Sequence, residues 1–244
     1  MNRLLLRLDS LFKLSDAERS ALRSALSSQR RHPANRASIA QCAPADTMSV
    51  ILEGFAYRYK LLPLGRRQIC GYLVAGDICG LRQSSLGQAE YALGTVGPAE
   101  TAILSPAPIL ESPELYPNLT RALWWSMLAE QSIAREWITN VGSRTAYERV
   151  AHLFCELFIR LQSVGLTRNN GCSLPFTQRD LADALSLSCV HVNRILRQMR
   201  LDGLLTFHHG NLHLADLSSL RAAAGFDSTY LHLSAAQVMP SKAF

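Results

Sequence analysis

The stretch that decides the fold is TQRDLADALSLSCVHVNRILRQMRLDGLL, which spans residues 177–205. Thr177 is an N-cap candidate with Asp180 three residues later, which predicts a helix that begins close to a capping-box arrangement. Ser186-Leu187 makes a tight connection, with Leu187 pointing inward, and Ser188 caps a second helix. The second helix has four apolar residues at helical spacing: Val192, Ile195, Leu196 and Met199. The pattern predicts a helix-turn-helix.

The opposite face of the second helix is polar and basic, and it carries Cys189, His191, Asn193, Arg194, Arg197 and Arg200. From Cys189 to Arg200 the chain has three arginines and no carboxylate. A helix in the DNA major groove needs such a face, because its first turn reaches base edges while flanking arginines neutralise phosphates. Arginine can bind guanine, and asparagine adenine, through two hydrogen bonds. We therefore interpret this helix as a DNA recognition helix.

Two short runs that favour strands, residues 202–207 and 212–214, follow the second helix. They flank residues 208–211, whose Gly-Asn pair favours a turn, so a β-hairpin is predicted. A hairpin in this place makes a winged helix-turn-helix. The alternative is an ordinary helical hairpin with a basic exposed face, but capping, turn, charge and hairpin together favour the winged form.

Composition sets wide limits on the function of this 244-residue chain. Apolar residues make up 48% and charged residues 18%, which suits one or two domains and excludes wholesale disorder. The net charge of +6 permits a nucleic-acid partner without requiring one.

No stretch offers the roughly 20 nearly uncharged apolar residues of a spanning helix, and no signal peptide is recognised, so we expect a cytoplasmic protein with no membrane partner. The six cysteines include no CxxC pair, so we expect mostly buried thiols and no zinc site.

The first part of the chain is predicted to be largely β. Ser15 and Glu18 form a capping box for a short helix that we expect to end near Pro33, since proline cannot continue a helix. Between residues 38 and 104, short apolar runs alternate with glycine and proline, which predicts an antiparallel sandwich or barrel. Turns are expected at residues 53–54, 63–65, 75–77 and 96–98.

Residues 119–142 predict a long helix. Six of them recur at alternating spacings of four and three: Leu123, Met127, Glu130, Ala134, Trp137 and Val141. This seam is either the core-facing side of a helix within one chain or the contact between two helices of a dimer, and the pattern is too short to decide. A further helix is expected from Ala146 to Val164, ended by Gly165, and a polar loop at residues 167–171.

Taken together, these segments resemble the Crp/Fnr superfamily of bacterial transcription regulators. The likeness covers almost the whole chain. It is strongest in RVAHL at residues 149–153 and in residues 177–205, and weaker in LGRRQI at 64–69 and GDI at 76–78. The resemblance implies a homodimer that binds a palindromic operator in double-stranded DNA and contacts RNA polymerase.

The implied fold is α+β and has three parts. Residues 1–118 would form an N-terminal β-roll, which is a double-stranded β-helix of the cyclic-nucleotide-binding type and serves as an effector or sensor domain. Residues 119–145 would form a long dimerisation helix, so the resemblance favours the dimer interpretation of that helix. Residues 146–244 would form the C-terminal winged helix-turn-helix domain.

The resemblance also implies which residues meet DNA. Bases are read from the first turn of the recognition helix and by an arginine that is Arg194 here. Val190 stands where the familiar residue is Glu, and Asn193 where Ser or Gly is common, which implies a half-site different from the best-known ones. Ser186 replaces the usual turn glycine. The expected DNA-binding residues are Gln178, Arg179, Ser188, Cys189, Val190, His191, Asn193, Arg194, Arg197, Arg200 and His209.

The effector pocket departs from the family pattern. Cyclic-nucleotide binders have a Gly-Glu pair and later an Arg-Ser pair for the cyclic phosphate, whereas here Leu81 follows Gly80, and Glu90 and Tyr91 stand at the later pair. A pocket with a carboxylate in place of its arginine suits an anion poorly, although Arg82 lies nearby in sequence. We therefore do not expect cyclic AMP. The candidate effector-pocket residues are Gly80, Arg82, Glu90 and Tyr91.

No cofactor, metal or catalytic site is expected. The family's oxygen sensors hold an iron–sulfur cluster through clustered N-terminal cysteines, whereas Cys42 stands alone here as the first cysteine. His32 is the only histidine before His152, which is too few for a metal-dependent cupin enzyme. The alternative function is a sensor whose β-roll binds an unidentified small molecule and thereby switches DNA binding.

Cys189 leaves two interpretations open. A position at a helix N-terminus and near arginines favours a reactive thiolate, so one interpretation is a redox switch of DNA binding. The other is a small side chain in van der Waals contact with a base.

Overall fold

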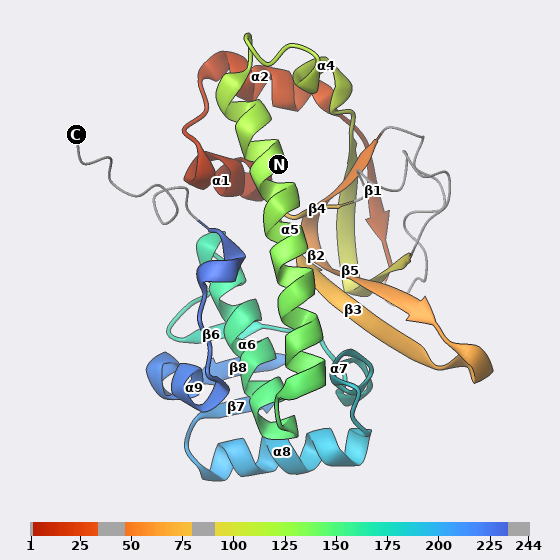
Figure 1. The fold of residues 1–244 in the computed structure, drawn as a ribbon, viewed down its shortest axis with the longest axis vertical. Coiled ribbons are helices and arrows are strands. Elements are labelled where there is room, and N and C mark those ends of the chain that lie inside the picture. The colour runs from red at the N-terminus through yellow and green to blue at the C-terminus, as the bar shows by residue number, and fades with distance from the viewer. Residues whose placement is uncertain (1, 34–46, 80–90, 234–244) are drawn as a thin grey trace.

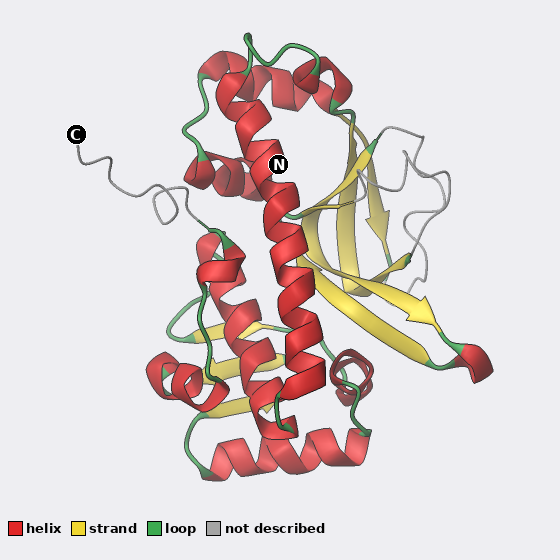
Figure 2. Cartoon of the chain, in the orientation of Figure 1, coloured by secondary structure: helices red, strands yellow, loops and turns green. Residues whose placement is uncertain are grey.

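The structure is a computed structural model that describes residues 2–33, 47–79 and 91–233 (Figure 1). One long helix, α5 (Pro117–Ser143), runs along most of the length of the molecule. A five-stranded sheet lies beside α5, and a separate three-stranded sheet lies among the C-terminal helices (Figure 2). The α+β fold expected from the sequence is confirmed. Within the described ranges, no helix is long and apolar enough to cross a bilayer.

The N-terminal part is an antiparallel sheet with helices packed at one end. Its helices are α1 (Asn2–Leu11), α2 (Asp16–Ala25) and α4 (Ala107–Leu110). Its strands are β1 (Leu26–His32), β2 (Met48–Leu61), β3 (Arg67–Val74), β4 (Ile78–Cys79) and β5 (Ala92–Leu104), and the short helix η2 (Pro63–Gly65) joins β2 to β3. The order in the sheet is β1-β5-β2-β3, with β4 paired to β2. A core that includes Leu8, Leu52, Leu104 and Leu123 holds α1 and α5 against the sheet.

The C-terminal part follows α5 directly. Its elements are α6 (Ala146–Ser163), β6 (Gly171–Ser173), α7 (Gln178–Leu185), α8 (Cys189–Leu201), β7 (Leu205–His208), β8 (Asn211–Leu214), α9 (Leu217–Ala224) and η3 (Thr229–Leu231). Helix α6 starts with a capping box between Thr145 and Glu148. The helix predicted from Ala146 is therefore confirmed, and its cap fixes where the chain turns out of α5.

The capping box predicted at Ser15 and Glu18 is present, but the helix is shorter than expected. It ends at Ala25, because Leu26 is extended and the following residues pair with β5 as an edge strand. The buried Glu18 carboxylate also accepts the backbone N–H groups of Asn118 and Leu119, at 2.7 and 2.9 Å. One side chain thus caps both α2 and the start of α5.

The turns expected at residues 53–54 and 96–98 are wrong, since both segments lie inside long strands. The register of β2 against β5 shifts on either side of Glu53, which marks a bulge. Gly54 has φ +77°, and a Cβ there would lie 2.3 Å from the carbonyl oxygen of Pro98. Glycine is needed at position 54 because the backbone of β5 passes close to it, and not because the chain makes a hairpin turn there.

Most of the seam predicted on α5 faces the chain's own core, although Ala134 is exposed. Leu123 and Trp137 are buried, and Glu130 forms an ion pair with Arg58 of β2 at 2.5 Å. For Leu123 and Trp137 the interpretation as a core-facing side is confirmed, but not for Ala134. A neighbouring stripe is exposed instead: Trp124 is 54% exposed, Leu128 60% and Ile138 73%.

A buried cluster of charges joins the sheet to α1 and α6. Asp77, which follows β3, binds Arg160 of α6 and Arg7 of α1, each at 2.5 Å, and Arg160 also binds Glu156 at 2.8 Å. Burial alone would raise the pKa of Asp77, but the two guanidinium groups lower it below its usual value. The carboxylate is therefore ionised in the folded protein at neutral pH.

Replacing Asp77 by Asn should lower the free energy of unfolding at pH 7 by about 3–5 kcal/mol, because two buried guanidinium groups lose their shared carboxylate. Urea unfolding measures the difference. The loss of stability should shrink at acid pH, because the stabilisation is complete above the unfolded carboxyl pKa and disappears as the pH falls through the lower folded pKa.

Asp9→Asn is the matched control: that side chain is 31% exposed. Removing its surface ion pair with Arg19 should cost about 1 kcal/mol or less, and an equal cost for both variants would contradict the role given to the cluster.

Candidate nucleic-acid interface

The predicted helix-turn-helix is present as α7 and α8. The hydroxyl of Thr177 accepts the N–H of Asp180 at 3.1 Å, and the Asp180 carboxylate accepts the N–H of Thr177 at 3.0 Å, which completes the capping box. Ser188 caps α8 by accepting the N–H of His191 at 3.1 Å. Between the helices, Ser186 adopts the left-handed conformation with φ 55°. This conformation explains why glycine is usual at that position, as the resemblance implied.

Helix α8 buries one face and exposes the other. Val192, Ile195 and Met199 are buried in the core shared with α6 and α7. Val190 is 81% exposed, and the arginines of α8 are exposed as well. Figure 1 shows α8 along the end of the molecule opposite α2, so this exposed face is accessible to a large partner.

The expected DNA-binding residues all lie in the described part of the chain. Apart from His191, which is half-buried, they are exposed: Gln178, Arg179, Ser188, Cys189, Val190, Asn193, Arg194, Arg197, Arg200 and His209. His209 lies at the tip of the β7–β8 hairpin, within the turn that the sequence predicted. The structure thus gathers these residues on the helix-turn-helix and its wing. Their contacts with bases and phosphates stay predictions.

The wing has one strand more than expected. Strand β6 pairs with β8 and gives the sheet order β6-β8-β7. In this segment the sequence predicted only a polar loop, at residues 167–171. Cys172 is buried opposite Leu212 in this pair. A strand of three residues leaves too short a periodicity to be read from sequence alone.

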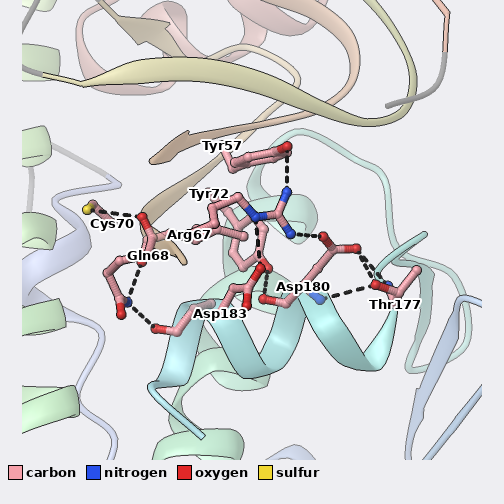
Figure 3. Close-up of polar contacts among 10 residues, drawn as sticks. Tyr57, Arg67, Gln68, Cys70, Tyr72, Thr177, Asp180 and Asp183 are labelled. Carbon is pink, nitrogen blue, oxygen red and sulfur yellow. Dashed lines mark hydrogen bonds and ion pairs between the residues drawn. The ribbon is translucent and has the colours of Figure 1, made fainter. Parts of the chain in front are cut away.

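The acidic side chains of α7 are held by an arginine that the site prediction missed. Arg67 of β3 binds Asp180 at 2.7 Å and Asp183 at 2.8 Å (Figure 3). The same guanidinium donates a hydrogen bond to the hydroxyl of Tyr57 at 2.7 Å. Arg67 belongs to the LGRRQI motif, so the sequence carried a sign of it, but nothing local placed it near α7. Here we call Tyr57, Arg67, Asp180 and Asp183 the Arg67 cluster.

Of the candidate effector-pocket residues, only Tyr91 can be placed. Gly80, Arg82 and Glu90 lie outside the described residues, as does Cys42. The guanidinium of Arg58 lies over the ring of Tyr91, 5.4 Å from its centre, and also binds Glu130 of α5. The cavity between β3 and α5, lined by Arg58 and Glu130 among others, has a volume of about 30 Å³. That volume is room for about one or two waters.

The thiols divide into two groups. Among the described cysteines, Cys79, Cys155 and Cys172 are buried, as expected for most of them, whereas Cys70 and Cys189 are exposed. Burial raises the pKa of each of the three buried thiols to about 12, so they are inert as nucleophiles. The described residues contain no group of three or more His, Cys, Asp or Glu side chains that could hold a metal ion.

An antiparallel sheet, a long helix and a winged helix-turn-helix with an arginine-rich second helix define a DNA-binding transcription regulator. Residues 148–223 match the model of the Crp-like helix-turn-helix domain. The chain is 31% identical over 174 residues to the nitrogen fixation regulation protein FixK of Bradyrhizobium diazoefficiens, across 71% of this chain and 72% of that protein. The chain belongs to the Crp/Fnr superfamily of transcription regulators.

Two further comparisons agree with this assignment. The chain is 26% identical over 218 residues to the transcriptional activator protein FnrL of Cereibacter sphaeroides, across 87% of both proteins. The solved structure of FixK2 from Bradyrhizobium japonicum has the same fold, with a TM-score of 0.70 and 24% identity over 82% of this chain and 98% of that one. The resemblance described from the sequence is therefore confirmed.

Proposed function

We propose that the chain is a homodimeric, sequence-specific transcription regulator that acts in the cytoplasm and is not an enzyme. Each subunit inserts α8 into the major groove at one half of a palindromic operator, and RNA polymerase is a further partner. The observation that carries the proposal is the exposed basic face of α8, which starts at a capped first turn and has no carboxylate. Dimer symmetry sets the two half-sites about one helical turn apart, roughly 34 Å.

The exposed stripe on α5 supports the dimer. Its positions follow one another at spacings of four and three, and all but the half-buried Gln131 are exposed: Trp124, Leu128, Gln131, Arg135, Ile138 and Gly142. This is the spacing of a coiled-coil seam, displaced by one residue from the seam that faces the core. An apolar stripe with Trp124, Leu128 and Ile138 each more than half exposed is typical of a surface that a second copy covers.

Leu128→Asp should raise the dimer dissociation constant about tenfold or more, because it places a charge at the centre of the apolar stripe. Sedimentation velocity over a concentration series measures this change. Leu115→Asp is the matched control, since Leu115 is 64% exposed and precedes α5. Dimers of equal affinity in both variants would contradict the α5 interface.

Arg194 is the residue on which sequence preference is expected to depend most. Its side chain is exposed on α8, where a guanidinium can reach the O6 and N7 atoms of guanine. Gln178, Arg179, Arg197 and Arg200 flank the same surface and are proposed to bind phosphates.

Arg194→Ala should cost about 1–3 kcal/mol of binding free energy on the preferred duplex and relax the sequence preference. Fluorescence anisotropy on a duplex selected from random DNA, compared with a scrambled duplex, measures both effects. Arg168→Ala removes an exposed arginine outside the helix-turn-helix and serves as the control. Equal losses on both duplexes would show that Arg194 contacts phosphate only.

We propose that neither cyclic AMP nor an iron–sulfur cluster controls DNA binding. For cyclic AMP, the support is the Arg58–Glu130 ion pair and the contact of Arg58 with Tyr91, through which protein side chains already join the sheet to α5. For an iron–sulfur cluster, the support is the sequence, in which Cys42 stands alone as the first cysteine. Tight, sequence-dependent binding by the ligand-free, reduced protein is the expected outcome of the same anisotropy experiment. Weak, sequence-blind binding would favour the alternative of a small-molecule sensor.

Cys189 is exposed, so the redox interpretation can be tested. The test compares the peroxide sensitivity of DNA binding in wild type and in Cys189→Ser.

A further inference from the structure

The Arg67 cluster links the N-terminal sheet to the first helix of the helix-turn-helix. Asp180 and Asp183 are three residues apart and lie on one face of α7, which is the face turned toward β3. The side chains of Arg67, Asp180 and Asp183 are 23%, 14% and 20% exposed. Both ion pairs are also hydrogen bonds shorter than 3 Å, so the guanidinium is held at fixed distances from two carboxylates.

Neighbouring side chains of β3 extend this contact along α7. The hydroxyl of Tyr72 donates to the backbone carbonyl of Asp180 at 2.9 Å, near the start of the helix. Gln68 donates to the carbonyl of Ala184 at 3.4 Å and accepts from the hydroxyl of Ser186 at 3.0 Å. Strand β3 thus contacts α7 from its first turn to its C-cap, on one side only (Figure 3).

The position of Tyr57 in the cluster is also fixed. The guanidinium of Arg67 lies 4.9 Å from the centre of the Tyr57 ring. A Cβ at Gly94 of β5 would lie 2.5 Å from that ring, so the absence of a side chain at Gly94 makes room for it. Tyr57 of the sheet therefore packs against the Arg67 guanidinium, while the carboxylates of Asp180 and Asp183 accept its hydrogen bonds.

The contact leaves the expected DNA-binding surface uncovered. Gln178 and Arg179, which the proposed function places at phosphates, are exposed on α7 although Asp180 and Asp183 are engaged. Helix α8 is joined to α7 by residues 186–188 and packs on it through a common core. Holding α7 therefore also holds α8, in an arrangement where its basic face is accessible.

We propose that Arg67 is a positioning residue for DNA binding: it fixes α7, and through α7 the recognition helix α8, in the orientation that binds the operator. The proposal rests on the proposed function, and it adds to that function a residue of the N-terminal sheet that touches no DNA. Arg67 acts through Asp180 and Asp183. Its loss lets the two helices move relative to the sheet, and so relative to the second subunit.

A simpler explanation would be charge alone, because Arg67 neutralises two carboxylates near DNA phosphates. The two explanations differ in sign for Asp183→Asn. Removing a negative charge near DNA would tighten binding by simple electrostatics. Removing one of the two partners of Arg67 weakens binding if the cluster acts by positioning.

The test is anisotropy on the selected duplex over a series of salt concentrations. We expect Arg67→Gln to bind about tenfold more weakly and Asp183→Asn about fivefold more weakly, within the range of ordinary coupling between sites. The double variant should bind no more weakly than Arg67→Gln, because both changes break the same contact. The slope of log affinity against log salt concentration should stay as in wild type, since no phosphate contact is lost.

Two further variants control for charge and folding. Arg66→Gln removes the neighbouring exposed arginine, which makes none of these contacts, and should bind as wild type. Arg67→Lys keeps the charge but has a point-like ammonium in place of the planar fork, so its affinity should lie between those of wild type and Arg67→Gln. Thermal unfolding shows that each variant is folded at the assay temperature, and Arg67→Lys carries the test if Arg67→Gln is not.

The results that would contradict this inference differ from the result that would contradict the proposed function. Wild-type affinity in Arg67→Gln or Arg67→Lys, on a duplex that wild type discriminates, would overturn this inference alone. Tighter binding by Asp183→Asn, or a salt slope lower by about 1 in Arg67→Gln, would also overturn it, in favour of charge or of a direct phosphate contact. Sequence-blind binding by wild type would overturn the proposed ligand-free function in favour of the small-molecule sensor, and this inference with it.

Discussion

The guanidinium of Arg160 joins parts of the chain that are far apart in sequence. It binds Asp77 beside the sheet and Glu156 one turn earlier in α6. Glu156 also accepts hydrogen bonds from the indole of Trp137 in α5, at 3.1 Å, and from the hydroxyl of Tyr230 near the C-terminus, at 3.0 Å. Buried charges are stable only while their partners stay in place. The sheet, α5, α6 and the C-terminal segment must therefore assemble together.

Apolar packing around this network places part of the N-terminal sheet in the same core as the helix-turn-helix. Phe176, just before α7, stacks on Tyr72 of β3 with ring centres 4.3 Å apart, and it meets Phe55 of β2 edge to face at 5.3 Å. The Arg67 cluster lies at the more exposed rim of this contact. The buried centre stabilises the association, whereas the rim, with its directional charged hydrogen bonds, fixes the angle of α7. The position of the recognition helix thus depends on residues in both halves of the chain.

The features that the sequence predicted well are those that depend on neighbours a few residues apart. The capping boxes at Ser15 and Thr177, the cap at Ser188 and the apolar face of α8 each involve contacts within one turn or two. The misjudged features depend on distant partners. Residues 26–32 form a strand because β5 offers an open edge, and Gly54 marks a bulge because β5 crosses close to it. Arg67 reaches Asp180 across more than a hundred residues, so no local pattern could join them.

Helix α5 shows why periodicity alone cannot identify an interface. It carries two stripes one residue apart, each with several apolar residues, and both have the spacing of a coiled coil. The stripe with Leu123 and Trp137 is buried against the sheet and α6, which leaves the stripe with Leu128 and Ile138 exposed. A helix that packs only on its own chain needs one such stripe and has polar residues elsewhere. A second stripe without a partner in the described part of the chain costs solubility and adds nothing to folding there. Its presence supports the proposed pairing of α5 with its copy. The same pairing would set the distance between two α8 helices, since α5 leads into α6 through a capped turn at Thr145.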